Sequence, residues 1–186
     1  DFRSGYYRDQ TIMMAQGHLD PEKLFAAIYA HPDVEKEPMS AGRQMVGHFS
    51  NKLIDENGNW LDQTKQINHI SDVSSIGAQM PRLVGLAQAS KIYRKLDIRG
   101  SEKFSKNGNE IAWGTIGNAG TSEGIFFEAI NAIGVLQIPI VMSVWDDGYG
   151  ISVKNEKQTT KQSISDALNG FKKEEDLSGI EILSVK

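Results

Sequence analysis

The second half of the chain alternates short apolar runs with segments whose apolar residues recur at helical spacing. In chain order, the runs and the helical segments occupy residues 111–116, 122–136, 138–144, 159–171 and 180–185. Strands and helices that alternate through short connections predict an α/β fold with a doubly wound, mostly parallel sheet and right-handed crossovers. Ligands of such sheets bind outside the carboxyl ends of the strands. The loops at 117–124 and 145–152 are therefore where we expect the chemistry of the chain.

The first half is less regular, and only two helices are predicted there. A short helical stretch covers residues 20–30, and a proline-punctuated polar segment from 31 to 50 is interpreted as loop. A second helix is predicted from 79 to 95, where apolar residues recur at helical spacing. They are Met80, Leu83, Leu86, Ala87 and Ile92. No internal repeat suggests a boundary, so residues 1–186 are expected to form one domain, and the opening at Asp1 leads us to expect a fragment of a longer chain.

Composition narrows the expected partners and location. The 186 residues suffice for one domain with its own core, and the 39% apolar and 24% charged contents are those of ordinary globular proteins. No apolar run approaches the roughly 20 residues of a membrane span, so no membrane association is expected. A net charge of −4 without a basic stripe argues against nucleic acid as a partner. The chain has no cysteine and no signal-peptide pattern, which is typical of the cytoplasm.

The first of the two loops, residues 117–124, is rich in glycine and joins a predicted strand to a predicted helix. Glycines allow the backbone to turn tightly and to approach a ligand, and the start of a helix offers unpaired N–H groups to an anion. This pattern predicts a phosphate site. An equally good interpretation is that Thr121 or Ser122 merely caps the helix, with Glu123 in its first turn.

The second loop, Trp145-Asp146-Asp147-Gly148-Tyr149-Gly150, follows the next predicted strand. Magnesium prefers a near-octahedral shell of oxygens from carboxylates, carbonyls, water and ligand phosphates. The carboxylate of Asp147, the amide oxygen of Asn118 and a backbone carbonyl, taken to be that of Tyr149, fit such a shell at one edge of the sheet. The alternative is an ordinary turn, which Asp and Gly favour for local reasons.

Residues 117–153 resemble the thiamine diphosphate motif, which opens with Gly-Asp-Gly and ends at an Asn that binds the metal. The version most similar to this chain is that of the alpha chains of 2-oxo acid dehydrogenase decarboxylating components. The matching runs are Thr121-Ser122-Glu123-Gly124, Glu128-Ala129-Ile130-Asn131 and Tyr149-Gly150-Ile151-Ser152. Transketolase carries a related motif, but its intervening residues match less well. The resemblance implies the thiamine diphosphate-binding fold, with that cofactor and Mg²⁺ as ligands.

Three further segments resemble the same alpha chains in the same order. They are residues 6–9, 42–48 and 74–81. In the first, the resemblance implies that Tyr7 and Arg8 reach the diphosphate, a role that suits the bidentate arginine side chain. In the second it implies that His48 lies beside the thiazolium as a catalytic residue. In the third it implies that Ser74 and Ile76 contact the bent cofactor.

The glycine turn and the metal ligands depart from the family pattern. The resemblance makes Gly117, Asn118, Ala119 and Gly120 a cofactor-binding turn, but the family has an acid where Asn118 stands and a glycine where Ala119 stands. The family's metal-binding Asn is Asp147 here, so the acid and the amide are exchanged and their summed charge is preserved. We expect magnesium binding in an altered geometry, with a non-catalytic subunit as the alternative.

The implied activity is the oxidative decarboxylation of a 2-oxo acid, with acyl transfer to lipoamide on the lipoyl domain of an acyltransferase. The run Arg43-Gln44-Met45 resembles enzymes of branched-chain 2-oxo acids more than pyruvate enzymes, so 3-methyl-2-oxobutanoate is the favoured substrate. The resemblance also implies a beta chain or beta domain that completes the active site, so this chain is expected to be inactive alone.

An oligomer is expected as well, because several large residues of the first half are expected to be exposed and suit an interface better than solvent. They are Tyr6, Tyr7, Met13, Met14 and Phe49. A different class of function stays open, namely a non-catalytic phosphate- or nucleotide-binding module on the same sheet, because a fold alone does not determine function.

Overall fold

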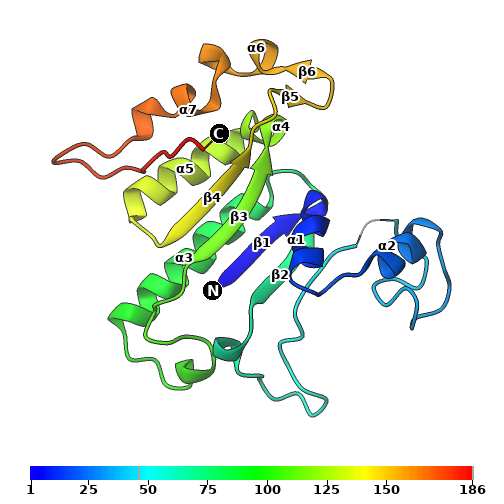
Figure 1. Ribbon diagram of the computed structural model, residues 1–186. Coiled ribbons are helices and arrows are strands. Elements are labelled where there is room, and N and C mark those ends of the chain that lie inside the picture. Colours follow the sequence, from blue (N-terminus) through cyan, green and yellow to red (C-terminus); the bar gives the residue numbers. More distant parts are fainter. Residues whose placement is uncertain (46, 186) are drawn as a thin grey trace.

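A computed structural model of the chain describes residues 1–45 and 47–185 and contains one main sheet (Figure 1). Its strands lie in the order β2-β1-β3-β4, and every neighbouring pair is parallel. The strands are β1 (Phe2–Tyr6), β2 (Asn68–Val73), β3 (Ala112–Gly117) and β4 (Ile140–Trp145). The predicted α/β class with a parallel sheet is confirmed.

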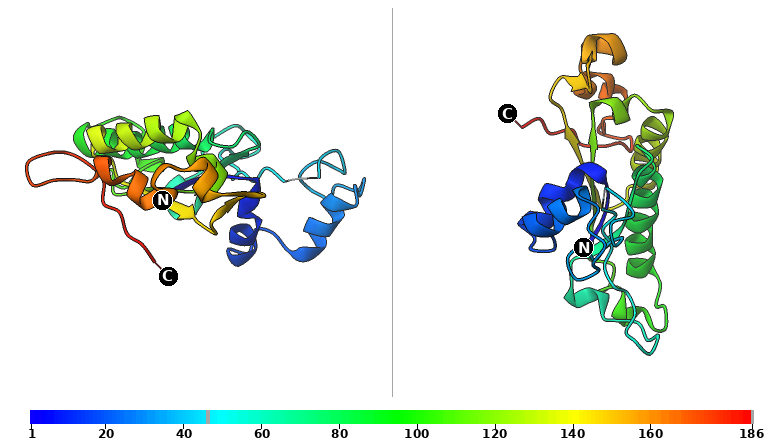
Figure 2. Two further views of the ribbon diagram at one scale, coloured as in Figure 1. Left: turned by 90° about the horizontal axis from the view of Figure 1, so that it is seen from above. Right: turned by 90° about the vertical axis from the view of Figure 1, so that its right-hand side faces the viewer.

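Two long helices cover one face of the sheet, as the right-hand view of Figure 2 shows. Helix α3 (Gln79–Lys95) has the predicted bounds, and α5 (Gly124–Leu136) begins slightly later than predicted because the four-residue helix α4 (Asn118–Thr121) precedes it. The core lies between these helices and the strands. Its buried members include Met80, Leu83, Ala87, Ala112, Ile116, Phe126, Ala129 and Ile130. The apolar spacing of the sequence therefore corresponds to the core of the protein.

The first half contains two strands that the sequence did not indicate. Strand β1 lies between β2 and β3, and it buries the polar side chains of Arg3 and Ser4 as well as Tyr6. Strand β2 buries Asn68, His69 and Asp72. The interpretation of this half as loops was therefore wrong at these two strands, because most of their buried side chains are polar and give no apolar alternation in the sequence.

The remaining elements of the first half are short. They are η1 (Tyr7–Asp9), α1 (Gln10–Ala15), α2 (Pro21–Ile28), η2 (Gln63–Lys65) and, beyond α3, η3 (Ser101–Lys103). Helix α2 confirms the helix predicted near 20–30. Asp20 caps it by accepting a 2.8 Å hydrogen bond from the Lys23 amide, and Pro21 occupies its first turn, where a missing N–H costs nothing.

The expectation that five large residues of the first half are exposed was partly wrong. Tyr6 and Met13 are 2% and 0% exposed, since Tyr6 ends a central strand and Met13 is the buried residue of α1. Tyr7, Met14 and Phe49 are partly buried. The predicted oligomer therefore stays a prediction without the support of Tyr6 and Met13.

The C-terminal part differs most from expectation. A small antiparallel pair, β5 (Tyr149–Gly150) and β6 (Val153–Lys154), follows β4. The helix predicted at 159–171 is broken into short pieces, since Lys161 and Gln162 have positive φ angles of 60° and 58°. The pieces that surround this break are α6 (Asn155–Gln158), η4 (Thr160–Gln162), α7 (Ile164–Ala167) and η5 (Asn169–Phe171). Ile164 and Leu168 still join the core, so the apolar spacing was correct while the continuous helix was not.

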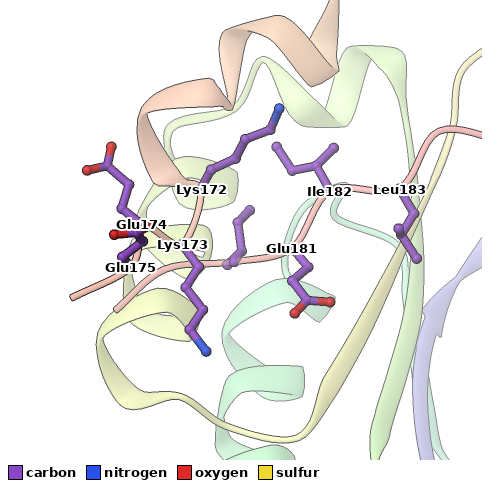
Figure 3. Close-up of a pocket in the computed structure, with 8 residues that line it drawn as sticks. Lys172, Lys173, Glu174, Glu175, Glu181, Ile182 and Leu183 are labelled. Carbon is purple, nitrogen blue, oxygen red and sulfur yellow. The ribbon is translucent and has the colours of Figure 1, made fainter. Parts of the chain in front are cut away.

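The last predicted strand, at 180–185, is not formed. Only Ile180 makes an isolated bridge, to Lys172, and Leu183 and Val185 are 86% and 94% exposed. An open cavity of about 510 Å³ lies between this segment and residues 172–175. Figure 3 shows Lys172 and Lys173 pointing to opposite sides of the segment, so their charges do not converge on a ligand.

Within the described residues, no helix is both long enough and apolar enough to cross a membrane.

Candidate functional site

The carboxyl ends of three parallel strands bring distant segments together. Strands β1, β3 and β4 end at Tyr6, Gly117 and Trp145, and the last two are paired partners in the sheet. The segments that follow them are η1, α4 and the loop that leads to β5, and Figure 1 shows them at one edge of the sheet. Both loops singled out in the sequence therefore lie at the edge where such sheets bind ligands.

The glycine turn makes close contacts with two of the predicted cofactor residues. A Cβ atom added at Gly117 would lie 2.6 Å from Nη1 of Arg8, which is closer than real Cβ contacts allow. A Cβ atom at Gly120 would lie 3.0 Å from Cγ2 of Ile76. The side chains of Arg8 and Ile76 therefore approach the turn at these two glycines, and a Cβ atom at Gly117 would have to displace the end of the Arg8 side chain.

Asn118 is buried at the centre of a hydrogen-bonded group. Its Nδ2 donates to the carboxylate of Asp146 and, at 2.9 Å, to Oδ1 of Asn155. The same Asp146 oxygen accepts from Nδ2 of Asn155 and from the Gly148 amide, both at 3.0 Å. Partial burial acts to raise the pKa of Asp146, but these hydrogen bonds outweigh it and hold the pKa below its ordinary value. Asp146 therefore joins the two loops as a carboxylate.

Asp147 has a different environment from Asp146. Its amide donates to Oδ1 of Asn118 at 3.3 Å, while its exposed carboxylate accepts from the Tyr149 amide at 3.0 Å. An open cavity of about 400 Å³ lies beside it. The lining residues are Arg8, Trp145, Asp146, Asp147, Tyr149 and Ile151. The three residues predicted to bind the metal, Asn118, Asp147 and Tyr149, are thus neighbours, and two of them share this cavity with Arg8.

A metal ion at this position would be bound mainly by carbonyl, water and phosphate oxygens, and not by a cluster of carboxylates. Within residues 1–45 and 47–185, no three His, Cys, Asp or Glu side chains gather as a metal site requires. Magnesium, however, takes one or two carboxylates and completes its shell with carbonyls, water and phosphate oxygens. Asp147 accepts only the Tyr149 bond from described groups, whereas Asp146 accepts three. Asp147 therefore has the more available carboxylate for a cation.

His48 is distant from Asp147 in the sequence, and it contacts a different residue predicted to bind the cofactor, Ser74. Its Nε2 is 2.5 Å from Oγ of Ser74, just beyond the end of β2. Ser74 stands two positions before Ile76, which contacts Gly120. The loop before His48 is held by Glu37, whose buried carboxylate accepts from the amides of Ser40 and Gly42 at 2.8 and 2.9 Å.

The chain is similar to proteins of a known family over most of its length. The family described as "Dehydrogenase E1 component" matches residues 1–172. The chain belongs to this family. The resemblance stated from the motifs is confirmed, because the relatives found are alpha subunits of 2-oxo acid dehydrogenases.

Three relatives illustrate the range of sequence identity and coverage. The 2-oxoisovalerate dehydrogenase subunit alpha of Bacillus subtilis (strain 168) is 28% identical over 171 residues, which are 92% of this chain and 43% of that protein. The pyruvate dehydrogenase E1 component subunit alpha of Bacillus cereus is 27% identical over 64% of this chain and 26% of its own length. The mitochondrial counterpart in Dictyostelium discoideum is 24% identical over 82% of this chain and 32% of its own. The chain spans less than half the length of these relatives.

In this member of the E1 family, a buried charged cluster lies beneath the site. Arg3 pairs with Asp9 and, at 3.2 Å, with Asp72, and Oγ1 of Thr115 donates to Asp9 at 2.6 Å. Burial, with the nearby charge of Asp9, raises the pKa of Asp72 to about 6 despite the attraction of Arg3. Because Asp9 directly follows Arg8, the cluster anchors the turn that carries Tyr7 and Arg8 to strand β3.

Sequence reasoning missed several of these supporting residues. Asp146 and Asn155 bind the side chain of Asn118, and Arg3 and Asp9 anchor η1. Asp146 belonged to the recognised second loop, so its charge was visible, but its neighbour Asp147 was the better match to the family. Nothing in the spacing of Arg3, Asp9 and Asp72 distinguishes them from surface charges.

Proposed function

We propose that this chain is the diphosphate-binding part of a 2-oxo acid dehydrogenase alpha subunit that binds thiamine diphosphate and Mg²⁺. The observation that carries the proposal is the approach of Arg8 to Gly117, beside a cavity that Asp147 also lines. A guanidinium and a carboxylate at one cavity suit a diphosphate and its metal ion, because one binds phosphate oxygens and the other binds the cation. The residues 1–186 would form one domain of this longer subunit.

Each residue has a distinct part in this proposal. Arg8 and Tyr7 bind the diphosphate against the turn formed by Gly117, Asn118, Ala119 and Gly120. Asp147, the amide oxygen of Asn118 and the carbonyl of Tyr149 provide oxygens to Mg²⁺. The bound cofactor supplies a carbanion-stabilising thiazolium, and the protein's task is to bind and orient it.

The other side of the turn would hold the reactive end of the cofactor. Ile76 lies against Gly120 and would support the bent cofactor from there. Ser74 hydrogen-bonds Nε2 of His48, which orients the imidazole and leaves Nδ1 as its second protonation site. In this arrangement His48 holds or moves a proton near the thiazolium.

The substrate and partners follow from the proposed class. A branched-chain 2-oxo acid such as 3-methyl-2-oxobutanoate is favoured over pyruvate, on the basis of residues 43–45 and of the B. subtilis relative, whose name is that of a 2-oxoisovalerate dehydrogenase. A beta chain or domain completes the active site, and the acyl group passes to a lipoyl domain. Comparing turnover of the two substrates by the reconstituted full-length complex tests this choice, and preference for pyruvate would overturn it.

The test of cofactor binding is calorimetric titration of the full-length alpha–beta complex with thiamine diphosphate at several magnesium concentrations. Asp147→Asn removes the more available carboxylate, so affinity should fall steeply and magnesium dependence should weaken. Adding Asn118→Asp to that variant restores one carboxylate and should recover much of the affinity, which a double-mutant cycle measures. If Asp147→Asn binds like the unaltered complex, the metal assignment is wrong.

A second candidate function is a subunit that keeps the fold without binding the cofactor. The observation in its favour is that Asn118 already uses its side chain within the protein, donating to Asp146 and Asn155 and accepting from Asp147. The same titration decides between the two functions. No binding by the unaltered complex, with binding by the Asn118→Asp, Asp147→Asn double variant, would identify the non-catalytic subunit.

A further inference from the structure

Tyr6 carries a buried hydroxyl that has no hydrogen-bond partner in the described part of the chain. The residue ends strand β1 and is only 2% exposed. Buried polar atoms nearly always have a partner, and leaving one without a partner costs about 1–3 kcal/mol. Packing of the ring alone therefore does not explain why the Tyr6 hydroxyl is buried without a partner.

The surroundings of this hydroxyl point to the glycine turn. The Cβ position of Gly117 lies 3.4 Å from the Tyr6 hydroxyl and 2.6 Å from Nη1 of Arg8. Two donors from the end of β1 therefore converge on one point of the turn. The guanidinium carbon of Arg8 lies 5.7 Å from the centre of the Tyr6 ring, so Tyr6 lies next to a residue that lines the cavity.

The phenol is protonated at neutral pH and so can donate. Burial raises the pKa of Tyr6 above its ordinary value, against the opposing charge of Arg8. A neutral phenol beside a guanidinium favours an acceptor that carries negative charge and several oxygens. Phosphate oxygens have this chemistry, and hydrogen bonds from neutral donors to charged acceptors are stronger than those between neutral groups.

We propose that the Tyr6 hydroxyl donates a hydrogen bond to a phosphate oxygen of the diphosphate bound at the Gly117 turn. The proposal rests on the proposed cofactor-binding function and adds a binding residue to it. Arg8, which lines the cavity beside Gly117, binds the same diphosphate in that proposed function. Tyr6 then binds the phosphate together with Arg8.

The experiment uses Tyr6→Phe in the full-length alpha–beta complex, because this change removes only the hydroxyl. Affinity for thiamine diphosphate with Mg²⁺, measured by calorimetry, should fall about 10- to 100-fold, as expected for a lost hydrogen bond to a charged group. The melting temperature of the cofactor-free complex should not fall, since the hydroxyl makes no bond there. Tyr93→Phe on α3 is the matched control and should change neither quantity.

A second probe locates the contact. Inorganic pyrophosphate with Mg²⁺ should show a similar loss in Tyr6→Phe, because it shares only the diphosphate with the cofactor. Unchanged affinity for both probes, or a loss confined to thiamine diphosphate, overturns the inference while leaving the proposed function intact. A lower melting temperature of the cofactor-free variant also overturns it, since the hydroxyl would then be bonded within the protein. If the unaltered complex binds neither probe, the proposed function fails and the inference fails with it.

Discussion

The two halves of the candidate site are built on different physical principles. Gly117 ends β3 and Asn118 follows it, and α3 packs on that strand with Leu83 lying against Gly114. Arg8 follows β1, whose buried positions instead hold Arg3 paired with Asp9 and Asp72. One half of the site thus rests on apolar packing and the other on buried charge.

This difference predicts how the stability of each half responds to substitutions. Apolar burial is graded, because each methylene group removed costs roughly 1 kcal/mol. A buried ion pair is closer to all-or-none, because removing one partner leaves an uncompensated charge in a low-dielectric environment. We therefore expect the Arg8 side of the site to be the more sensitive to single polar substitutions.

The largest effect is expected from Arg3→Ala. Without Arg3, the carboxylates of Asp9 and Asp72 stay buried without their cation, which should lower the free energy of unfolding by about 3–5 kcal/mol. Denaturant unfolding of the full-length protein measures this. Lys65→Ala is the control, since Lys65 is 79% exposed in its pair with Asp62 and such pairs contribute about 0–1 kcal/mol. Equal losses in the two variants would contradict the contrast between buried and exposed pairs.

The apolar half supplies the second prediction. Leu83 is fully buried between α3 and the sheet, so Leu83→Ala should cost about 2–5 kcal/mol. Leu83→Met keeps most of the volume and should cost less than about 1.5 kcal/mol. The loss of stability in the apolar half should therefore scale with the volume removed, which is not expected of the buried ion pairs. Equally severe losses in the two Leu83 variants would contradict this. Urea titrations of the two variants give the comparison.

The charged half also predicts a pH dependence with two opposing contributions. Burial raises the pKa of Asp72 to about 6, so its contribution to stability falls as pH rises from about 4 to about 6. Burial, followed by the charges of Arg3 and His18, lowers the pKa of His69 to about 4, so its contribution rises with pH between about 4 and 6.5. The two slopes have opposite signs in the same window and largely cancel.

Substitutions should separate these slopes. In Asp72→Asn only the His69 contribution remains, so stability should increase as pH rises from 4 to 6.5. In His69→Gln the Asp72 contribution remains, and stability should decrease over the same window. Unfolding free energies measured at several pH values give both slopes, and slopes of the same sign in the two variants would show that this assignment of groups is wrong.

The contrast between the two halves also explains what could be read from the sequence. The bounds of α3, strand β3 and the two loops were predicted because apolar spacing and glycines report directly on local structure and packing. Strands β1 and β2 were missed because Arg3, Asp9 and Asp72 resemble surface charges until the fold brings them together. A strand of this kind has no local pattern that distinguishes it.

The candidate site likewise contains features that the sequence indicated and others that it did not. The motifs assigned Arg8, Ile76 and the glycine turn to one cofactor, and the structure has Arg8 beside Gly117 and Ile76 beside Gly120, while their roles toward the cofactor stay predictions. They did not indicate that Asn118 would be bound by Asp146 and Asn155. Side-chain orientation within a loop depends on neighbouring backbone turns, and residue types alone do not determine it. The continuous helix at 159–171 failed for a related reason, since left-handed residues at Lys161 and Gln162 interrupt a correct apolar pattern.

The smallest predicted effect concerns the hydrogen bond that links the two halves. Oγ1 of Thr115 on β3 donates to Asp9, which directly follows Arg8 in the chain. Thr115→Val keeps the shape but removes this donor, so unfolding stability should fall by about 1–3 kcal/mol. Affinity for thiamine diphosphate should fall several-fold as well, because the turn that carries Arg8 is less firmly held against Gly117. Thr115→Ser retains the hydroxyl and should keep the affinity of the unaltered complex, although it loses a buried methyl group. If the Thr115→Val and Thr115→Ser variants bind the cofactor equally well, the hydrogen bond from Thr115 is not needed to position Asp9. Arg3 alone would then hold Asp9, and Arg8 would be oriented by the charged half of the site without the apolar half.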